Sequence, residues 1–159
     1  ADSKVLTAHQ REVLYKEITE QAICYSVARA SVAEIDQYNI LQSTMMAMRR
    51  AVIALKTQPD FVAVDGNRLP TWEYKAEAVV KGDGRVEVIS AASIIAKVVR
   101  DAEMVAFDAK YPGYGFAKNK GYGTAQHMEA LKRLGATPIH RRSFAPVSEN
   151  LLPEQQLLL

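Results

Sequence analysis

A short apolar run, "FVAVD" at residues 61–65, constrains the fold more than any other stretch of the sequence. Successive apolar residues predict a strand that is buried on both faces, and such strands occur in sheets covered by helices. The run stops at Asp65 and Gly66, where a buried strand would reach the polar rim of its sheet. "EAVVKGDG", residues 77–84, predicts a second short strand that runs into a glycine turn.

Helical patterns surround these strands. Thr7 with Gln10, and Ser31 with Glu34, form capping boxes, which mark the first residues of helices. We expect helices at residues 8–21, from Ser31 to about residue 38, at 39–56 with Asn39 as cap, at 88–110 and at 125–134 between Thr124 and Gly135. "ICYSVARA", residues 23–30, alternates in part and predicts another strand. Strands mixed with helices predict an α/β fold, a sheet flanked by helices.

Composition excludes some classes of protein. The 159 residues suit one domain, and no apolar run is long enough to span a membrane. The single cysteine, Cys24, excludes an internal disulfide, and no signal peptide is visible, so we expect a cytoplasmic protein with no membrane partner. The net charge of +2 permits nucleic-acid binding without demanding it.

Two aspartates are candidates for chemistry. Asp65 would be exposed at the rim of the sheet, where α/β folds bind ligands, although Asp-Gly is also a common turn pair. Asp101 lies on the helix predicted at 88–110, one turn after Lys97, and a surface ion pair is the alternative for it. Converging carboxylates suit Mg²⁺, but two are too few to hold two ions well. We find no zinc-ligand spacing, P-loop or nucleophile elbow.

The stretch "YPGYGFAKNKGYGT", residues 111–124, combines glycines, lysines and aromatic residues. Glycines allow close backbone approach to a polyanion, lysines neutralise phosphates, and a tyrosine can stack on a base or read a ribose 2′-hydroxyl. The alternative is a structural loop whose aromatic side chains fill the core. Tyr111, Tyr114 and Phe116 suit that alternative, whereas Tyr122, between two glycines, suits a ligand contact.

Seven segments together resemble bacterial ribonuclease HII. They are "DSK" (2–4), "EIDQYNILQSTMMAMRRAV" (34–52), "VDGN" (64–67), "VKGD" (80–83), "SAASIIAKVVRD" (90–101), "YPGYGFAKNKGYGT" (111–124) and "HRRSFAPV" (140–147). The resemblance implies a ribonuclease H-like fold and cleavage of the RNA strand of RNA–DNA hybrids. It also implies cutting at ribonucleotides embedded in duplex DNA, with Mg²⁺ or Mn²⁺.

The resemblance implies roles for individual residues. Asp65 and Asp101 match two of the family's four metal-binding carboxylates, and Tyr122 matches the tyrosine at the ribose–deoxyribose junction. The residues expected to contact substrate phosphates are Ser3, Lys4, Lys118, Lys120, Arg141 and Arg142. Asn119 stands where many relatives have histidine, which argues against proton transfer at this position.

The family's first strand carries an Asp-Glu pair and a Gly-Arg-Gly turn, and both are absent from this chain. From the resemblance we expect a domain at residues 1–147 without its central first strand, followed by a tail at 148–159. We expect this chain to be inactive or nearly so, and to associate through strand edges at 23–30 and 61–65, whereas the complete enzyme would be a monomer. A non-catalytic module that binds hybrids is the alternative function.

Overall fold

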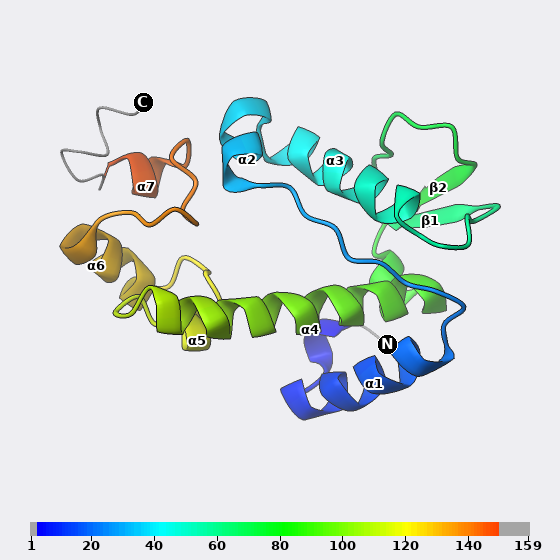
Figure 1. The fold of residues 1–159 in the computed structure, drawn as a ribbon, viewed down its shortest axis with the longest axis horizontal. Coiled ribbons are helices and arrows are strands. Elements are labelled where there is room, and N and C mark those ends of the chain that lie inside the picture. The colour runs from blue at the N-terminus through cyan, green and yellow to red at the C-terminus, as the bar shows by residue number, and fades with distance from the viewer. Residues whose placement is uncertain (1–2, 150–159) are drawn as a thin grey trace. The chain divides into compact units, whose positions relative to one another are not determined.

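A computed structural model describes residues 3–149. The chain forms two compact units: the first takes in the chain up to Ala30 and Leu41–Val99, and the second takes in Ser31–Ile40 and the chain from Arg100. The elements, labelled in Figure 1, are η1 (Ser3–Val5), α1 (Ala8–Gln21), α2 (Val32–Tyr38), α3 (Ile40–Ile53), β1 (Val62–Asp65), β2 (Ala76–Val79), η2 (Gly82–Gly84), α4 (Glu87–Lys110), α5 (Phe116–Asn119), α6 (Ala125–Leu134) and α7 (Ala145–Ser148).

Capping residues identified in the sequence begin three of these helices. Thr7 and Ser31 each accept the backbone N–H three residues on and complete reciprocal capping boxes at α1 and α2. Thr124 accepts the N–H of His127 at the start of α6, and Gly135, at φ +77°, ends that helix. Each box satisfies two backbone donors that a helix terminus otherwise leaves without an internal partner, which is why the predicted helix starts are confirmed.

The predicted start of α3 is confirmed, because the helix begins at Ile40, directly after Asn39. Asn39 also ends α2: its φ is +76° and its N–H donates to the carbonyl of Ile35. Asparagine tolerates this left-handed conformation better than most residues. At its other end, α3 stops at Ile53 rather than at residue 56, and the Gln58 side chain donates to the carbonyls of Val52 and Ile53 in the helix and of Leu55 just after it. A side-chain cap of this kind from outside the helix has no local signature in the sequence.

The strand predicted at residues 23–30 is also wrong, since the segment pairs with no strand among residues 3–149. It is extended, and its residues alternate between exposed and half-buried as those of a strand would. Side chains hold it instead: the Ser26 hydroxyl donates to the carbonyl of Ala51, and Arg50 donates to that of Arg29. Alternation alone cannot supply the neighbouring strand that a ladder requires.

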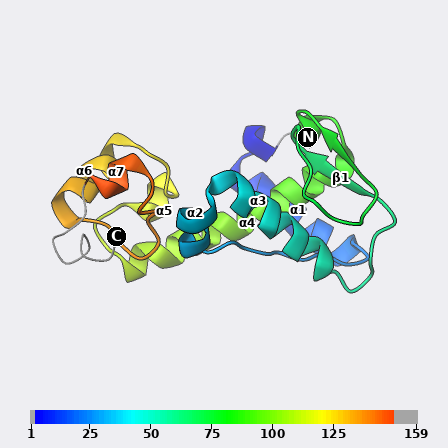
Figure 2. The same cartoon turned by 90° about the horizontal axis from the view of Figure 1, so that it is seen from above.

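β1 and β2 confirm the two other predicted strands and form a parallel pair, with Val62 opposite Ala76 and Asp65 opposite Val79. They lie side by side in two perpendicular views (Figures 1 and 2). The ladder continues at both ends, because the Val62 N–H donates to Lys75 and the Gly66 N–H to Val79. Within the first unit Val64 of β1 and Ile89, Ile94 and Ile95 of α4 are buried. A parallel sheet with helices is the expected α/β class.

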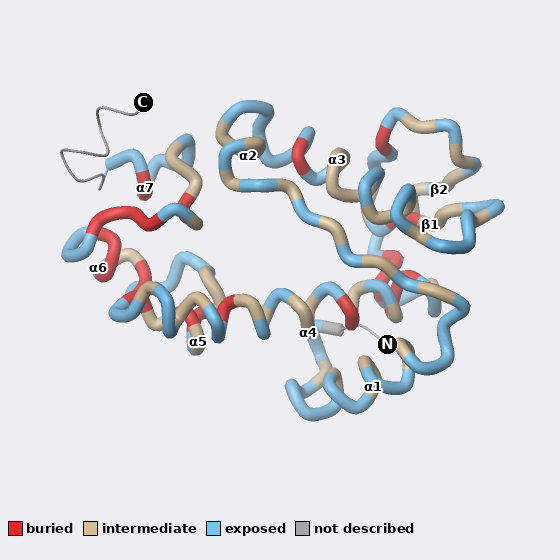
Figure 3. The backbone as a smooth tube through the Cα atoms, viewed as in Figure 1, coloured by how far each residue is buried: buried red, intermediate tan, exposed pale blue. Residues whose placement is uncertain are grey.

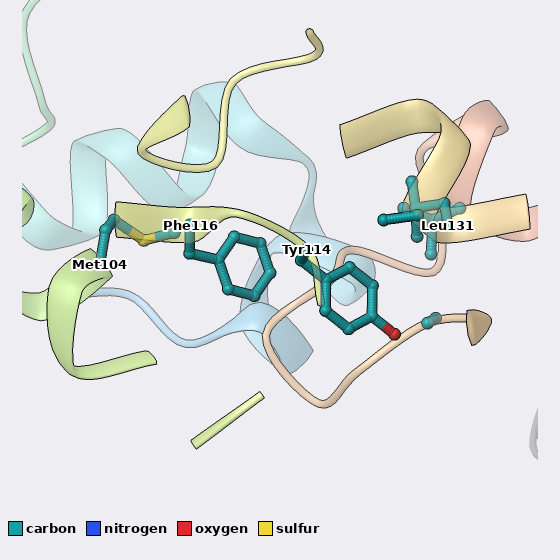
Figure 4. Packing of buried hydrophobic residues seen from close by; sticks show 7 residues of the cluster. Met104, Tyr114, Phe116 and Leu131 are labelled. Carbon is teal, nitrogen blue, oxygen red and sulfur yellow. The ribbon is translucent and has the colours of Figure 1, made fainter. Parts of the chain in front are cut away.

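The second unit has an aromatic core. Tyr114 and Phe116 stack with ring centroids 5.1 Å apart and planes inclined by 3° (Figure 4). Both are buried with Met104 and Leu131, and the Tyr114 hydroxyl donates to the carbonyl of Gly135 at 2.6 Å. Burial also raises the pKa of Tyr114, which keeps the hydroxyl protonated as a donor. Figure 3 shows the buried residues of α6 and of the segment after it. The core role predicted for Tyr114 and Phe116 is confirmed.

Asp36 ties α2 to the segment that follows α6. Its carboxylate accepts from the backbone N–H of Arg142 at 3.1 Å, the N–H of Ser143 at 3.0 Å and the Ser143 hydroxyl at 2.6 Å. Burial opposes ionisation, but these hydrogen bonds and the charge of Arg141 outweigh it and lower the pKa of Asp36 below 3.8. The boundary predicted at residue 147 falls inside α7, and residues 150–159 of the predicted tail lie outside the described range.

Replacing Asp36 by Asn should lower the free energy of unfolding by about 1–2 kcal/mol at pH 7, because the amide cannot accept all three hydrogen bonds. The depressed pKa means that the contribution is present above pH 3.8 and is lost as the pH falls further. Urea unfolding at pH 7 and below pH 4 measures this difference. Exposed Asp60→Asn is the control. An equal loss for both variants, or one independent of pH, would contradict the role given to Asp36.

Candidate functional site

Asp65 ends β1 with an exposed side chain, as the sequence predicts. Its Oδ1 accepts the backbone N–H of Gly82 at 2.9 Å. A side chain at residue 82 would be crowded: an added Cβ would lie 2.6 Å from Cδ1 of Ile89, 3.3 Å from Cβ of Val79 and 3.4 Å from Asp65 Oδ1. Glycine therefore allows the turn after β2 to approach the carboxylate at the end of β1.

Asp83 follows Gly82 directly and is 9% exposed. The Ser90 hydroxyl, in the first turn of α4, donates to its carbonyl. The structure thus places a second acidic residue one position from the hydrogen bond to Asp65. Sequence reasoning missed Asp83, although "VKGD" follows a predicted strand and the carboxyl ends of neighbouring parallel strands meet at one edge. That signal could have identified it.

Asp101, the other predicted carboxylate, lies on α4 in the second unit and is half-buried. Its pairing with Asp65 stays a prediction. Among residues 3–149 no three His, Cys, Asp or Glu side chains gather as a ready metal site. Asp65 and Asp83 nevertheless offer the carboxylate oxygens that Mg²⁺ and Mn²⁺ prefer, and Mg²⁺ usually takes one or two carboxylates and keeps several waters. The chemistry of these two residues therefore suits one such ion, and a second ion would need further ligands.

Asn119 organises the loop that leads to Tyr122. It is buried; its Nδ2 donates to the carbonyl of Tyr114 at 2.7 Å and its Oδ1 accepts the N–H of Gly121 at 2.8 Å. Lys120 and Gly121 both have positive φ, +54° and +85°. The stretch predicted to be irregular thus contains the short helix α5 and a turn closed by an amide. The amide of Asn119 has a structural role here, in keeping with the argument against proton transfer.

The turn presents Tyr122 with 67% of its surface exposed, in contrast to buried Tyr114 and Phe116. The lysines of the same loop, Lys118 and Lys120, are exposed and half-exposed, respectively. A flat ring in solvent between lysines and glycines can stack on a sugar or base while cations approach phosphates.

The remaining predicted substrate residues lie elsewhere in the chain. Arg141 and Arg142 follow α6 in the second unit and are half-buried; Arg141 lies over the ring of Phe144, 4.7 Å from its centroid. Ser3 and Lys4 lie in η1, in the first unit. The structure therefore brings the predicted contacts of the second unit onto two segments, one on each side of α6.

His127 and His140 form a buried pair that sequence reasoning missed. Their Nε2 atoms are 2.8 Å apart, and the side chains are 5% and 7% exposed. Nδ1 of His127 is 2.9 Å from the carbonyl oxygen of Tyr122. Burial and the neighbouring His127 lower the pKa of His140 to about 4, so the ring is neutral near pH 7. The sequence places His140 beside two arginines but does not show its partner, which lies on a different segment.

The family model described as Ribonuclease HII matches residues 1–147. Ribonuclease HII from Acidovorax sp. (strain JS42) is 62% identical over 151 residues, which cover 95% of this chain and 72% of the relative. The chain belongs to the ribonuclease HII family. Ribonuclease HII from Paracidovorax citrulli (strain AAC00-1) is 61% identical over 148 residues, covering 93% of this chain and 62% of the relative.

The fold supports membership in the ribonuclease HII family. The crystal structure of ribonuclease H2 from Pyrococcus horikoshii OT3 has a TM-score of 0.80 and 28% identity, and the match covers 93% of this chain and 78% of the other. The predicted resemblance and ribonuclease H-like α/β class are both confirmed. Members of the ribonuclease HII family are nucleases of the endoribonuclease class. Across residues 3–149, no helix is both long and apolar enough to cross a membrane.

The neutral state of His140 predicts a pH effect on stability. Its pKa falls from 6.5 to about 4 on folding, so the contribution is complete above pH 6.5 and is lost as the pH falls toward 4. The loss should be on the order of 3 kcal/mol. Unfolding between pH 4 and 7 measures it, with His140→Asn as comparison because Asn can accept a hydrogen bond but does not titrate. The same pH slope in both proteins would contradict this assignment.

Proposed function

We propose that the protein hydrolyses the RNA strand of RNA–DNA hybrids and cuts at ribonucleotides embedded in duplex DNA, with Mg²⁺ or Mn²⁺, in the cytoplasm. The observation that carries this proposal is the hydrogen bond from Gly82 to Asp65, because it brings the turn that bears Asp83 to the carboxylate at the end of β1. The same edge of a parallel sheet is where α/β folds bind ligands. Residues 1–147 form the family domain in this proposal, and 148–159 form a tail.

Asp65 and Asp83 are the residues proposed to hold the cation. When bound, a divalent ion lowers the pKa of a water and neutralises charge that develops on phosphate oxygens. Asp65 supplies the oxygen that Gly82 does not engage, and the buried turn fixes its position. Asp101 stays a second, separate prediction for this role.

The substrate side of the proposal rests on the second unit and on η1. Tyr122 stacks on the sugar next to the ribonucleotide and senses its 2′-hydroxyl, since its ring is exposed on a turn that other side chains fix. The residues proposed to hold backbone phosphates are Ser3, Lys4, Lys118, Lys120, Arg141 and Arg142. These cations position the duplex without reading its sequence.

The number of carboxylates that could bind metal ions predicts how well residues 1–159 alone hydrolyse RNA–DNA hybrids. Two-ion phosphodiester hydrolysis needs more ligands than one pair of aspartates can supply, and no larger acidic group gathers among residues 3–149. We propose that this polypeptide alone hydrolyses hybrids poorly or not at all. Cleavage tests of metal roles therefore use the protein expressed from its complete coding sequence.

Asp65→Asn should abolish cleavage and weaken Mn²⁺ binding at least about tenfold, while hybrid binding persists. Asparagine can still accept the hydrogen bond from Gly82, so the turn should remain folded. Asp83→Asn should weaken Mn²⁺ binding similarly, and Asp101→Asn is the matched comparison on the same protein. Electron paramagnetic resonance of free Mn²⁺ measures the affinity.

Two outcomes decide between the aspartates. If Asp101→Asn weakens Mn²⁺ binding and Asp83→Asn does not, Asp101 is the partner of Asp65 and the assignment of Asp83 fails. If Asp65→Asn cuts normally, the metal site is elsewhere.

The extended segment at 23–30 gives residues 1–159 a surface for self-association. Ile23, Tyr25 and Val27 are 90%, 46% and 37% exposed and lie on one side of the segment. We propose that copies of this polypeptide associate there, because exposed extended backbone with apolar side chains pairs readily with other chains. Tyr25→Lys should then shift sedimentation toward the monomer. A monomer at the highest soluble concentration before any substitution would disprove association.

A further inference from the structure

The buried contact between His127 and His140 needs one hydrogen, because two ring nitrogens 2.8 Å apart can share only one. Buried polar groups of this kind are costly unless each finds a complementary partner. The direction of the shared hydrogen bond is fixed by groups at the far side of each ring.

The Thr137 backbone determines the tautomer of His140. Its N–H lies 2.9 Å from Nδ1 of His140, and a backbone amide can only donate, so this nitrogen must accept. In the neutral ring the hydrogen is then on Nε2, which donates to His127. Nε2 of His127 therefore accepts, its hydrogen is on Nδ1, and Nδ1 donates to the carbonyl of Tyr122. If His127 donated to His140 instead, Nδ1 of His140 would carry the hydrogen and would face the Thr137 N–H, donor against donor.

The surroundings of the pair hold the rings in this arrangement. His127 meets the ring of Phe116 edge-on, with centroids 5.4 Å apart, and Tyr114 lies 5.3 Å from His140. The Thr137 hydroxyl lies 2.9 Å from Nδ1 of His140. The pair therefore forms a directed series of hydrogen bonds from Thr137 to Tyr122.

Each end of this series of hydrogen bonds lies next to residues that are proposed to contact the substrate. The Tyr122 carbonyl accepts from the Thr124 N–H at 2.8 Å and from His127, so its main chain is held while the residue remains 67% exposed. At the other end His140 immediately precedes Arg141 and Arg142, and the Arg142 N–H is held by Asp36.

We propose that His127 and His140 are positioning residues that set the separation between the Tyr122 ring and the Arg141–Arg142 turn. A ring and two cations at a fixed separation engage one sugar and its neighbouring phosphates together, with little ordering left to occur on binding. This inference rests on the proposed role of Tyr122. The competing explanation is a buried polar pair that only stabilises the core.

Two substitutions at one position separate these explanations. In His127→Asn the amide nitrogen replaces Nδ1 and can still donate to the Tyr122 carbonyl, while contact with His140 is lost. In His127→Gln the amide group replaces Nε2 and can still accept from His140, while the bond to Tyr122 is lost. Both variants lose the ring that packs on Phe116, so a purely structural role predicts similar effects from the two.

The first readout is spectroscopic and uses residues 1–159. Nitrogen-15 shifts of the imidazoles should show the hydrogen on Nδ1 of His127 and on Nε2 of His140. The carbonyl carbon-13 shift of Tyr122 should change in His127→Gln and be retained in His127→Asn. The reverse tautomers, or equal carbonyl shifts in both variants, would overturn the proposal without reference to any activity.

The second readout is KM and kcat for a duplex with a single ribonucleotide, in the protein expressed from its complete coding sequence. His127→Gln should raise KM about three- to tenfold and leave kcat nearly unchanged, as expected for one lost hydrogen bond at a binding residue. His127→Asn should raise KM less, because it keeps the hydrogen bond to Tyr122 and loses only the one to His140. In a Tyr122→Ala background the effect of His127→Gln should disappear, because the histidine acts through the tyrosine.

Each contrary result has one meaning. Equal losses in the two variants, or losses additive with Tyr122→Ala, would reduce the histidines to structural residues and overturn the inference. If Tyr122→Ala itself binds the substrate normally, the proposed function of Tyr122 fails, and the carbonyl shift decides whether the histidines position its main chain.

Discussion

The approach of the Gly82 backbone to the Asp65 carboxylate is the contact on which the candidate metal site depends. A single N–H donates to Oδ1 of Asp65, and a side chain at position 82 would crowd Ile89, Val79 and the Asp65 carboxylate. Lys81, at φ +56°, begins that turn in a conformation that costs a residue with a side chain about 1 kcal/mol or more. Packing of Ile89 and the hydrogen bond from Ser90 stabilise the same turn from the start of α4. Local strain is thus compensated by contacts that also position an acidic residue.

The second unit relies on a different principle, the satisfaction of buried polar groups inside an aromatic core. Tyr114 donates to Gly135, Asn119 both donates and accepts within its loop, and the two histidines satisfy one another. Each buried group left without its partner would cost about 1–3 kcal/mol, which strongly favours one arrangement of the loop. Apolar packing alone allows side chains to repack, whereas directed hydrogen bonds specify which carbonyl lies where. This explains how an exposed ring such as Tyr122 can be carried on a well-defined main chain.

Local signals predicted much of this structure, and non-local contacts account for what they missed. Capping boxes at Thr7 and Ser31 and the apolar run at β1 act within a few residues, so the sequence shows them directly. The interpretation of 23–30 failed because a strand needs a partner. The further role of Asn39 in ending α2 was not foreseen, because a residue between two helices can serve both. At the site, Asp65 and Tyr122 could be anticipated from their glycine neighbours. Asp83 could have been found from its place after a predicted strand. The histidine pair could not be ranked without knowing which segments meet, since its significance lies in a hydrogen bond between residues 13 positions apart.

The turn at the strand end and the hydrogen-bonded loop suit the two tasks proposed for this nuclease, which are binding a cation and contacting a sugar. A cation requires oxygen ligands at nearly fixed distances, and the ends of paired strands provide that because ladder hydrogen bonds determine the register of β1 and β2. A sugar ring tolerates more variation in contact geometry, so a loop residue suffices if its backbone is restrained. Restraint through the Tyr122 carbonyl acts on the main chain, and the residue itself is 67% exposed. Discrimination for a 2′-hydroxyl can then come from the ring, while its location is decided by main-chain hydrogen bonds formed before the substrate arrives.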